Sequence, residues 1–411
     1  MTPAPGQPIR VHGLSVSYFT GKIEAYLRAK GLAYELVEMD TRSFRRCARI
    51  TGVAQMPQLE LPDGRWLTDS TQIMTHFERT AAEFAIYPDD PALRFIADLL
   101  EDFGDEWLWR PAMYYRWSFE SDARRVSDRL ARSMLRDVPL PVLLRRWLIR
   151  SRQRRYFLHG DGVNLATASA IKAVYIDVLD AMQTALSSRP FLMGERPTQA
   201  DFGFFGSMFR HFASDPTPAA MMRERSPRVL EWVHRLWNLT PDQFVDRSMP
   251  ATLPSGLDRL LCLTCEDYLP YLDANERAFE AGALQVSWHS RTIEFSTAVN
   301  PYRVWCLQQL RRQFQTMDGA GRAQVEAWLL SFGAGGGRSA IRLLRQAVGP
   351  KALTLAVPAG TAASSQVGTD AVLNSHWMQE RSYFSALSAK MKRKQTREFA
   401  PTESTIGKEI S

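Results

Sequence analysis

The chain has 411 residues, of which 45% are hydrophobic and 23% charged, a composition typical of a globular protein with sizeable cores. Its length predicts about two to three domains, and it contains no run of about 18 apolar residues, which excludes a membrane-spanning helix. The net charge is +7, and four cysteines in so long a chain predict a reducing compartment, the cytoplasm, without a disulfide framework.

The first predicted elements form a β-α-β unit. Residues 9–14 are a short apolar run typical of a strand, and the following helix ends at Lys30-Gly31, a basic last turn with a glycine cap. Residues 34–39 predict a second strand, parallel to the first because a helix separates the two. Ser17 lies where the first strand gives way to the helix, a position at which serine often serves as an N-cap.

Residues 53–73 predict a strand, a turn, a second strand and the start of a helix. Leu59 and Leu61 alternate with polar residues, which is the period of a half-buried strand. This strand is entered through Met56-Pro57. An X-Pro bond is cis in only about 5–6% of folded cases, so the local sequence by itself favours a trans bond.

The helix that follows these strands is predicted to begin at Asp69-Ser70, after a turn at residues 62–64. Both side chains can cap the N-terminus of the helix. Backbone N–H groups at a helix start also attract a carboxylate. Asp69 and Ser70 are therefore candidates for capping and for anion binding, and the two roles are compatible.

From residue 92 onward the pattern is helical only. Aromatic residues cluster at 107–119, where most are expected in the core and some can form an apolar wall for a ligand. Residues 120–160 follow and are predicted to form one or two helices, interrupted by Pro139 and Pro141.

Residues 120–160 also hold eleven arginines against four acidic residues, a net charge of +7 that equals that of the whole chain. This basic segment can contact an anionic membrane surface, nucleic acid or an acidic partner. It can equally be a solvated helical face, or pair within the chain with the acidic residues that precede it. Those residues are Glu101, Asp102, Asp105 and Glu106.

Two further helices carry recognisable signals. Thr198-x-x-Asp201 before an apolar run is a capping box and predicts the start of a helix. The box lies within the string Phe191-Leu-x-Gly-x-x-Pro-Thr-x-Ala-Asp-Phe202, and residues 226–237 predict a later amphipathic helix.

The last third of the chain is of mixed character. Residues 246–340 predict a hairpin that turns at His289-Ser290, followed by two helices. Residues 341–411 are rich in small and polar residues and then basic, a composition typical of a mostly disordered tail. No metal-ligand spacing such as H-E-x-x-H occurs, so no metal site is predicted.

Residues 53–73 and the string that ends at Phe202 resemble the glutathione transferase superfamily, and the resemblance covers about residues 8–240. It implies an α/β thioredoxin-like N-terminal domain with the order βαβαββα, followed by an all-α domain. The rest of the chain is then an extra α+β extension. The expected boundaries are residues 8–82, 91–245 with the basic insert 120–160, 246–340, and a tail at 341–411.

The resemblance also implies a site. In this family the proline at the position of Pro57 is cis, and the backbone of the residue before it, here Met56, pairs with the cysteinyl part of glutathione. The acid–serine pair, here Asp69 and Ser70, holds the γ-glutamyl end. Ser17 matches the serine that donates a hydrogen bond to the sulfur in Ser-type members, and it is the predicted catalytic residue.

The implied activity is addition of the glutathione thiolate to a small hydrophobic electrophile, with glutathione as co-substrate and no metal. Family members are commonly homodimers. The alternative is a non-catalytic, metaxin-like binding or scaffold protein, which the basic insert, the extension and Met56, where the family more often has Val, all favour. The presence of Ser17, Asp69 and Ser70 favours the enzyme.

Overall fold

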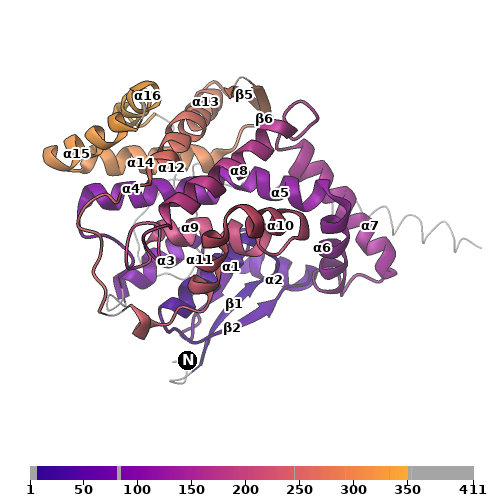
Figure 1. The fold of residues 1–411 in the computed structure, drawn as a ribbon. Coiled ribbons are helices and arrows are strands. Elements are labelled where there is room, and N and C mark those ends of the chain that lie inside the picture. Colours follow the sequence, from indigo (N-terminus) through magenta and orange to yellow (C-terminus); the bar gives the residue numbers. More distant parts are fainter. Residues whose placement is uncertain are drawn as a thin grey trace, which may run out of the picture. The chain divides into compact units, whose positions relative to one another are not determined.

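A four-stranded sheet with the strand order β2-β1-β3-β4 organises the N-terminal part of the chain (Figure 1). Strands β1 and β2 are parallel, and β3 runs antiparallel to both β1 and β4. The element order confirms the predicted βαβαββα arrangement. The elements are β1 (Ile9–Gly13), α1 (Tyr18–Ala29), β2 (Tyr34–Glu38), α2 (Thr41–Thr51), β3 (Gln58–Glu60), β4 (Trp66–Thr68) and α3 (Ser70–Thr80).

The structure is a computed structural model that describes residues 7–80, 85–244, 246–291, 293–332, 334–349 and 353. Residues Met1–Leu373 cluster into one compact unit, and the second unit, Asn374–Ser411, lies outside the described residues. The prediction of a disordered tail therefore falls mostly outside the described residues.

A predominantly helical region follows the sheet, as expected. Helix α9 lies at its centre: each of its nine residues is buried, and it packs against α1 and α4. The elements are α4 (Pro91–Asp102), η2 (Phe103–Trp107), α5 (Trp109–Ser118), α6 (Glu120–Arg132), α7 (Val142–Gln153), η3 (Arg154–His159), α8 (Ala168–Ala185), α9 (Gln199–Ser207), η4 (Met208–Phe212), α10 (Pro216–Arg225), α11 (Pro227–Trp237) and η5 (Pro241–Gln243).

The predicted capping box opens helix α9. The backbone N–H of Thr198 donates to the carboxylate of Asp201 over 2.9 Å, and Asp201 also accepts from Leu192 N–H and from Trp232 Nε1. Because these donors satisfy a carboxylate that is fully buried, the box holds the chain before α9 as well as the helix itself.

A buried ion cluster joins the N-terminal sheet layer to the helical region. Lys22 on α1 is fully buried, and its Nζ lies 2.6 Å from Glu101 Oε1 and 2.5 Å from Asp105 Oδ2. Burial acts to lower the pKa of Lys22, but the two carboxylates outweigh it and raise the pKa, so the lysine stays charged. Two of the acidic residues expected to pair with the basic insert are therefore engaged by Lys22 instead.

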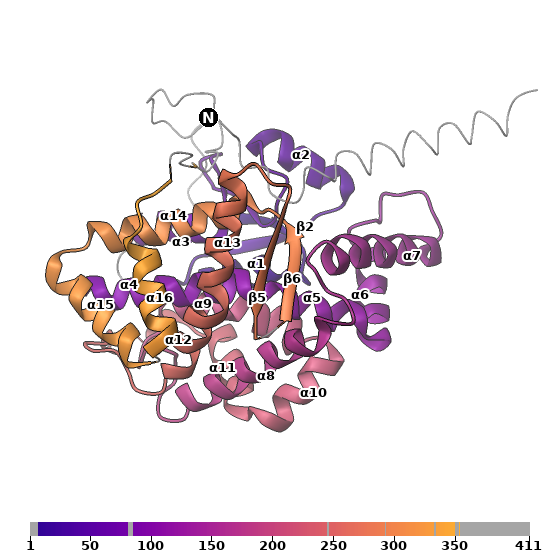
Figure 2. The ribbon, with the colours of Figure 1, turned by 90° about the horizontal axis from the view of Figure 1, so that it is seen from above.

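The C-terminal extension packs on α4 through α14 and α15 (Figure 2). In that view its helices lie at the opposite end of the helical region from α6 and α7. Its elements are α12 (Asp258–Leu263), η6 (Thr264–Tyr268), α13 (Leu269–Glu280), β5 (Gln285–Ser290), β6 (Ile293–Ala298), α14 (Pro301–Thr316), α15 (Gly319–Ser331) and α16 (Ala334–Arg345).

Two expectations for the extension need correction. The hairpin does not turn at His289-Ser290, because both residues are paired within β5, with Glu294 and Ile293 of β6. The folded part also continues past residue 340: α16 runs to Arg345, and Leu353 is buried against residues of α14.

Candidate functional site

Three loops that carry the predicted site residues leave the sheet at one edge. Gln58 of β3 pairs with His12 of β1 and with Thr68 of β4. Continuing this register by one position places Pro57 beside the end of β1 and beside Asp69, which follows β4. The sheet therefore brings together the β1–α1 turn, the loop before β3 and the start of α3.

Ser17 is the N-cap of α1, and its side chain is half-buried. Its Oγ accepts a hydrogen bond from Thr20 N–H over 3.4 Å. A hydroxyl that accepts in this way keeps its own hydrogen for donation to another group. The capping role is therefore present, and it is compatible with the predicted catalytic role.

Two arginines from the helical region hold the β1–α1 turn. Arg116 donates to the carbonyl oxygen of Val16 over 2.8 Å, and Arg129 donates to Ser15 Oγ over 2.9 Å. Asp215 pairs with Arg116 at 2.6 Å, and Glu38 pairs with Arg129 at 2.8 Å. Each charge has a carboxylate beside it, so the arginines position the turn more than they add net charge to it.

The Met56–Pro57 peptide bond is cis. Met56 is half-buried and Pro57 is buried. The loop before them is held by Gln58, whose Nε2 donates to the carbonyl oxygens of Val53, over 2.7 Å, and Gln55, over 3.0 Å. The alternation of polar and apolar residues in the strand predicts that the Gln58 side chain faces solvent, but it is fully buried. The sequence therefore did not identify Gln58 as the residue that positions this loop.

Asp69 adopts a left-handed backbone conformation with φ of 68°. Its Oδ1 accepts from Gln72 N–H over 3.0 Å, which caps α3, and its Oδ2 accepts from the hydroxyl of Tyr302 over 2.8 Å. Burial raises the pKa of Asp69, although these hydrogen bonds and nearby Lys22 oppose the shift. Ser70 is buried at the start of α3.

Tyr302 belongs to α14 of the extension, so the extension reaches the predicted γ-glutamyl position. Other side chains of α14 contact acidic residues of α4 and η2. Arg303 lies 2.9 Å from Glu106, and Gln313 donates to Asp98 over 2.5 Å. No sequence signal connected Tyr302 to Asp69, because a tyrosine at the start of a helix is equally compatible with packing alone.

The aromatic cluster of residues 107–119 is mostly core: Trp107, Tyr114, Tyr115 and Trp117 are buried. Trp109 is half-buried and stacks on Phe19 of α1, two residues after Ser17, with ring centroids 6.2 Å apart. Through this contact Trp109 is the member of the cluster that lies beside the β1–α1 turn.

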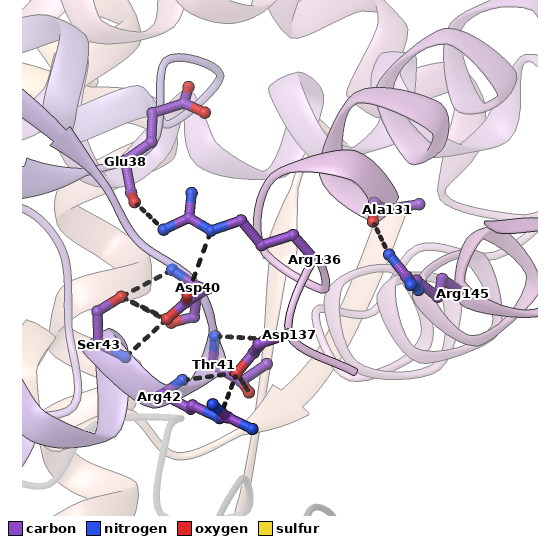
Figure 3. A network of polar contacts seen from close by, with 9 residues as sticks. All are labelled: Glu38, Asp40, Thr41, Arg42, Ser43, Ala131, Arg136, Asp137 and Arg145. Atoms are coloured by element: carbon purple, nitrogen blue, oxygen red, sulfur yellow. Dashed lines mark hydrogen bonds and ion pairs between the residues drawn. The ribbon is translucent and has the colours of Figure 1, made fainter. Parts of the chain in front are cut away.

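The basic insert binds the N-terminal layer through the loop after α6 (Figure 3). Asp137 accepts from the backbone N–H of Thr41, over 3.3 Å, and of Arg42, over 3.1 Å, at the start of α2. Arg136 pairs with Asp40 at 3.2 Å. Burial acts to raise the pKa of Asp40, but hydrogen bonds from Ser43 and the Arg136 guanidinium outweigh it and lower the pKa.

The intramolecular partners of the insert are not the predicted ones. Glu106 pairs with Arg303, and Asp102 accepts from Tyr268 over 2.7 Å. The arginines of the insert instead pair with its own acidic residues and with carboxylates of β2, of the following loop and of the segment before α10. These carboxylates are Glu120, Asp128, Glu38, Asp40 and Asp215.

Comparison with known proteins matches residues 11–84 to the family model "Glutathione S-transferase, N-terminal domain". Glutathione S-transferase U7 of Arabidopsis thaliana is 28% identical over 108 residues, and the probable glutathione S-transferase BZ2 of Zea mays is 33% identical over 115 residues. Each match covers 26% of this chain and 48% of the relative, so the chain spans about half the length of the curated relatives it matches.

Two solved structures are also similar in part. The β-etherase LigF from Sphingobium sp. strain SYK-6 superposes with a TM-score of 0.40 at 20% identity, covering 56% of this chain and 95% of that one. A Tau class glutathione S-transferase from mango, Mangifera indica, superposes with a TM-score of 0.37 at 15% identity, covering 56% and 88%.

Two kinds of feature are absent from the residues that the structure describes. In the part of the chain that the structure describes, no helix is both long and apolar enough to cross a membrane. The same residues contain no cluster of three or more His, Cys, Asp or Glu side chains placed to hold a metal ion.

Proposed function

We propose that the chain belongs, through its N-terminal domain, to the glutathione transferase superfamily, and that it binds glutathione at the edge of the sheet and transfers the glutathione thiolate to a small hydrophobic electrophile. The observation that carries the proposal is the convergence of three loops: the β1–α1 turn with Ser17, the loop with Met56-Pro57, and the α3 start with Asp69-Ser70.

The reaction requires a thiolate, because the thiolate and not the thiol is the nucleophile. An unperturbed thiol has a pKa of about 8.5, so little of it is ionised at neutral pH. In the proposed mechanism the Ser17 hydroxyl donates a hydrogen bond to the sulfur, and the N-terminus of α1, equivalent to about half a positive charge, stabilises the anion further.

The other site residues bind and orient glutathione. Backbone groups of Met56 pair with the cysteinyl part, and the γ-glutamyl end lies at Asp69 and Ser70. Each oxygen of Asp69 accepts one hydrogen bond within the chain, and a carboxylate oxygen can accept a second. Asp69 therefore has the capacity to receive the ammonium group of glutathione, either beside the Tyr302 hydroxyl or in its place. Trp109 and Phe19 form the apolar wall proposed for the electrophile.

Calorimetric titration with glutathione and a conjugation assay with a chlorinated nitroaromatic test the proposal. Ser17→Gly is the sharpest variant, because glycine replaces a serine N-cap at a cost of only a few tenths of a kcal/mol but has no hydroxyl. We expect conjugation to fall by about tenfold or more with an almost unchanged melting temperature, and Ser17→Thr to retain part of the activity. Full activity in Ser17→Gly refutes the assigned role.

A second function, a non-catalytic binding or scaffold protein, is favoured by the Tyr302–Asp69 hydrogen bond, because the chain itself then occupies part of the γ-glutamyl position. Absence of both glutathione binding and conjugation in the native chain supports this alternative. Binding that weakens in Asp69→Ala supports the enzyme. The homodimer and the cytoplasmic location stay predictions, and light scattering of the purified chain tests the first.

A further inference from the structure

Helix α7 of the basic insert presents an apolar face to solvent. The residues Leu143, Leu144 and Trp147 are 72%, 49% and 63% exposed. Their spacing of one and four positions places them on one side of the helix. Large apolar side chains are ordinarily exposed one at a time, and three together on one helix face indicate an interaction surface.

The helix is nevertheless firmly attached to the protein by its other side. Helix α7 packs against α6 and η3, and Ile149 on its inner side is buried. Arg145 donates to the carbonyl oxygen of Leu140 over 2.7 Å and to that of Ala131 over 3.4 Å, the second of which Figure 3 shows. The exposed apolar face is thus a fixed feature of the fold.

Positive charge surrounds this face. Helix α7 contains four arginines and no acidic residue. Nearby carboxylates are shared: Glu120 lies within 4 Å of three guanidinium groups and Asp128 of two. Five cations therefore share two anions, and an excess of positive charge remains. The five arginines are Arg124, Arg150, Arg154, Arg132 and Arg146.

We propose that α7 docks flat on an anionic membrane surface. Leu143, Leu144 and Trp147 enter the boundary between headgroups and acyl chains, and the surrounding arginines contact lipid phosphates. Leucine and tryptophan on one face of a helix with arginine beside them is the composition of an interfacial amphipathic helix. The anionic lipids attract the basic insert before the apolar side chains are buried.

Three other occupants of this face are disfavoured, the first two of them by charge. A second copy of the chain that used the same face would bring an identical basic insert against the first, and like charges repel. The C-terminal segment Lys390-Met-Lys-Arg-Lys394 is basic as well. Nucleic acid would satisfy the arginines but would leave Leu143 and Leu144 without an apolar partner.

Vesicle flotation of the full chain tests the proposal. We expect binding to phosphatidylcholine vesicles with about 30% phosphatidylserine to be about tenfold or more tighter than to phosphatidylcholine alone, and to weaken as salt is added. Leu143→Glu and Trp147→Glu should each lower the affinity about tenfold, because each removes one apolar side chain from the boundary. Leu284→Glu is the matched control, since Leu284 is 87% exposed outside the insert.

Several outcomes overturn the proposal: no binding to anionic vesicles, equal binding to neutral ones, or equal losses in Leu143→Glu and Leu284→Glu. Self-association that disappears in Leu143→Glu assigns the face to a second copy instead. Duplex DNA binding that Trp147→Glu abolishes, without vesicle binding, assigns it to nucleic acid. The assay needs no glutathione, so its result is independent of the proposed transferase activity.

Discussion

Replacing Tyr302 by phenylalanine separates the two candidate functions. Tyr302→Phe deletes the hydroxyl that donates to Asp69 Oδ2 over 2.8 Å and keeps the ring, which packs on Trp305 with centroids 5.5 Å apart. A hydrogen bond to a charged group contributes about 1.5–3 kcal/mol to stability. Since Asp69 Oδ1 still accepts from Gln72 N–H and keeps α3 capped, we expect the free energy of unfolding to fall by about 1.5–2 kcal/mol, the lower end of that range.

The same substitution should strengthen glutathione binding. If the ammonium group of glutathione takes the position of the hydroxyl on Asp69, the native chain must first give up its own hydrogen bond. Every 1.4 kcal/mol changes an affinity by about tenfold. Tyr302→Phe should therefore raise the affinity for glutathione about tenfold, measured by calorimetric titration of both chains.

Tyr271→Phe is the matched control, because the Tyr271 hydroxyl accepts from Arg303 over 2.9 Å within the same extension and does not contact Asp69. It should lose comparable stability and leave glutathione affinity unchanged. An affinity that falls in Tyr302→Phe refutes the competition and makes the hydroxyl part of the binding site. If neither the native chain nor Tyr302→Phe binds glutathione measurably, the result favours the non-catalytic scaffold function.

Three further predictions concern stability. Lys22→Met leaves two buried carboxylates unpaired and should lower the free energy of unfolding by about 3–5 kcal/mol in urea denaturation. Asp102→Asn should become progressively more stable than the native chain as the pH rises from about 4 to 7. Gly337→Ala places a methyl group 2.0 Å from the carbonyl oxygen of Leu329 and should lower the free energy of unfolding by about 1–3 kcal/mol. Gly335→Ala in the same helix meets no atom within 4 Å and should raise the free energy of unfolding by up to about 1 kcal/mol.

The sign of the Asp102 effect follows from burial, which raises the pKa of this carboxyl from 3.8 to about 7. Below pH 4 or so both the folded and the unfolded chain hold the proton. Between about 4 and 7 the unfolded chain releases it first, so Asp102 lowers the stability by up to about 4 kcal/mol, a penalty that asparagine does not have. If the stability difference between Asp102→Asn and the native chain stays constant across this pH range, the raised pKa of Asp102 is contradicted. If the Lys22→Met chain is as stable as the native chain, the stabilising role of the buried ion cluster is contradicted.

Local signals in the sequence determined the order of the elements in the N-terminal domain and the helix starts. The βαβαββα order, the box of Thr198 and Asp201, and the break between α6 and α7 at Pro139 and Pro141 each depend on residues a few positions apart. Such features follow from local backbone conformation and hydrogen bonding, which residues close together in the sequence determine. The candidate site residues are local features in the same sense, since each lies at the end of a strand or the start of a helix.

Tertiary structure alone decided which side chains meet at the site. Tyr302 reaches Asp69 across 233 positions of sequence, and Asp137 reaches the start of α2 across about 96. Gln58 looked like a solvent-facing residue because strand alternation cannot tell a buried amide with partners from an exposed one. The acidic residues 101–106 bond Lys22, Tyr268 and Arg303 in place of the basic insert. Partners of this kind depend on how distant elements pack. A pattern of charges in the sequence does not identify them, because any residue of opposite charge that lies close in space can serve as the partner.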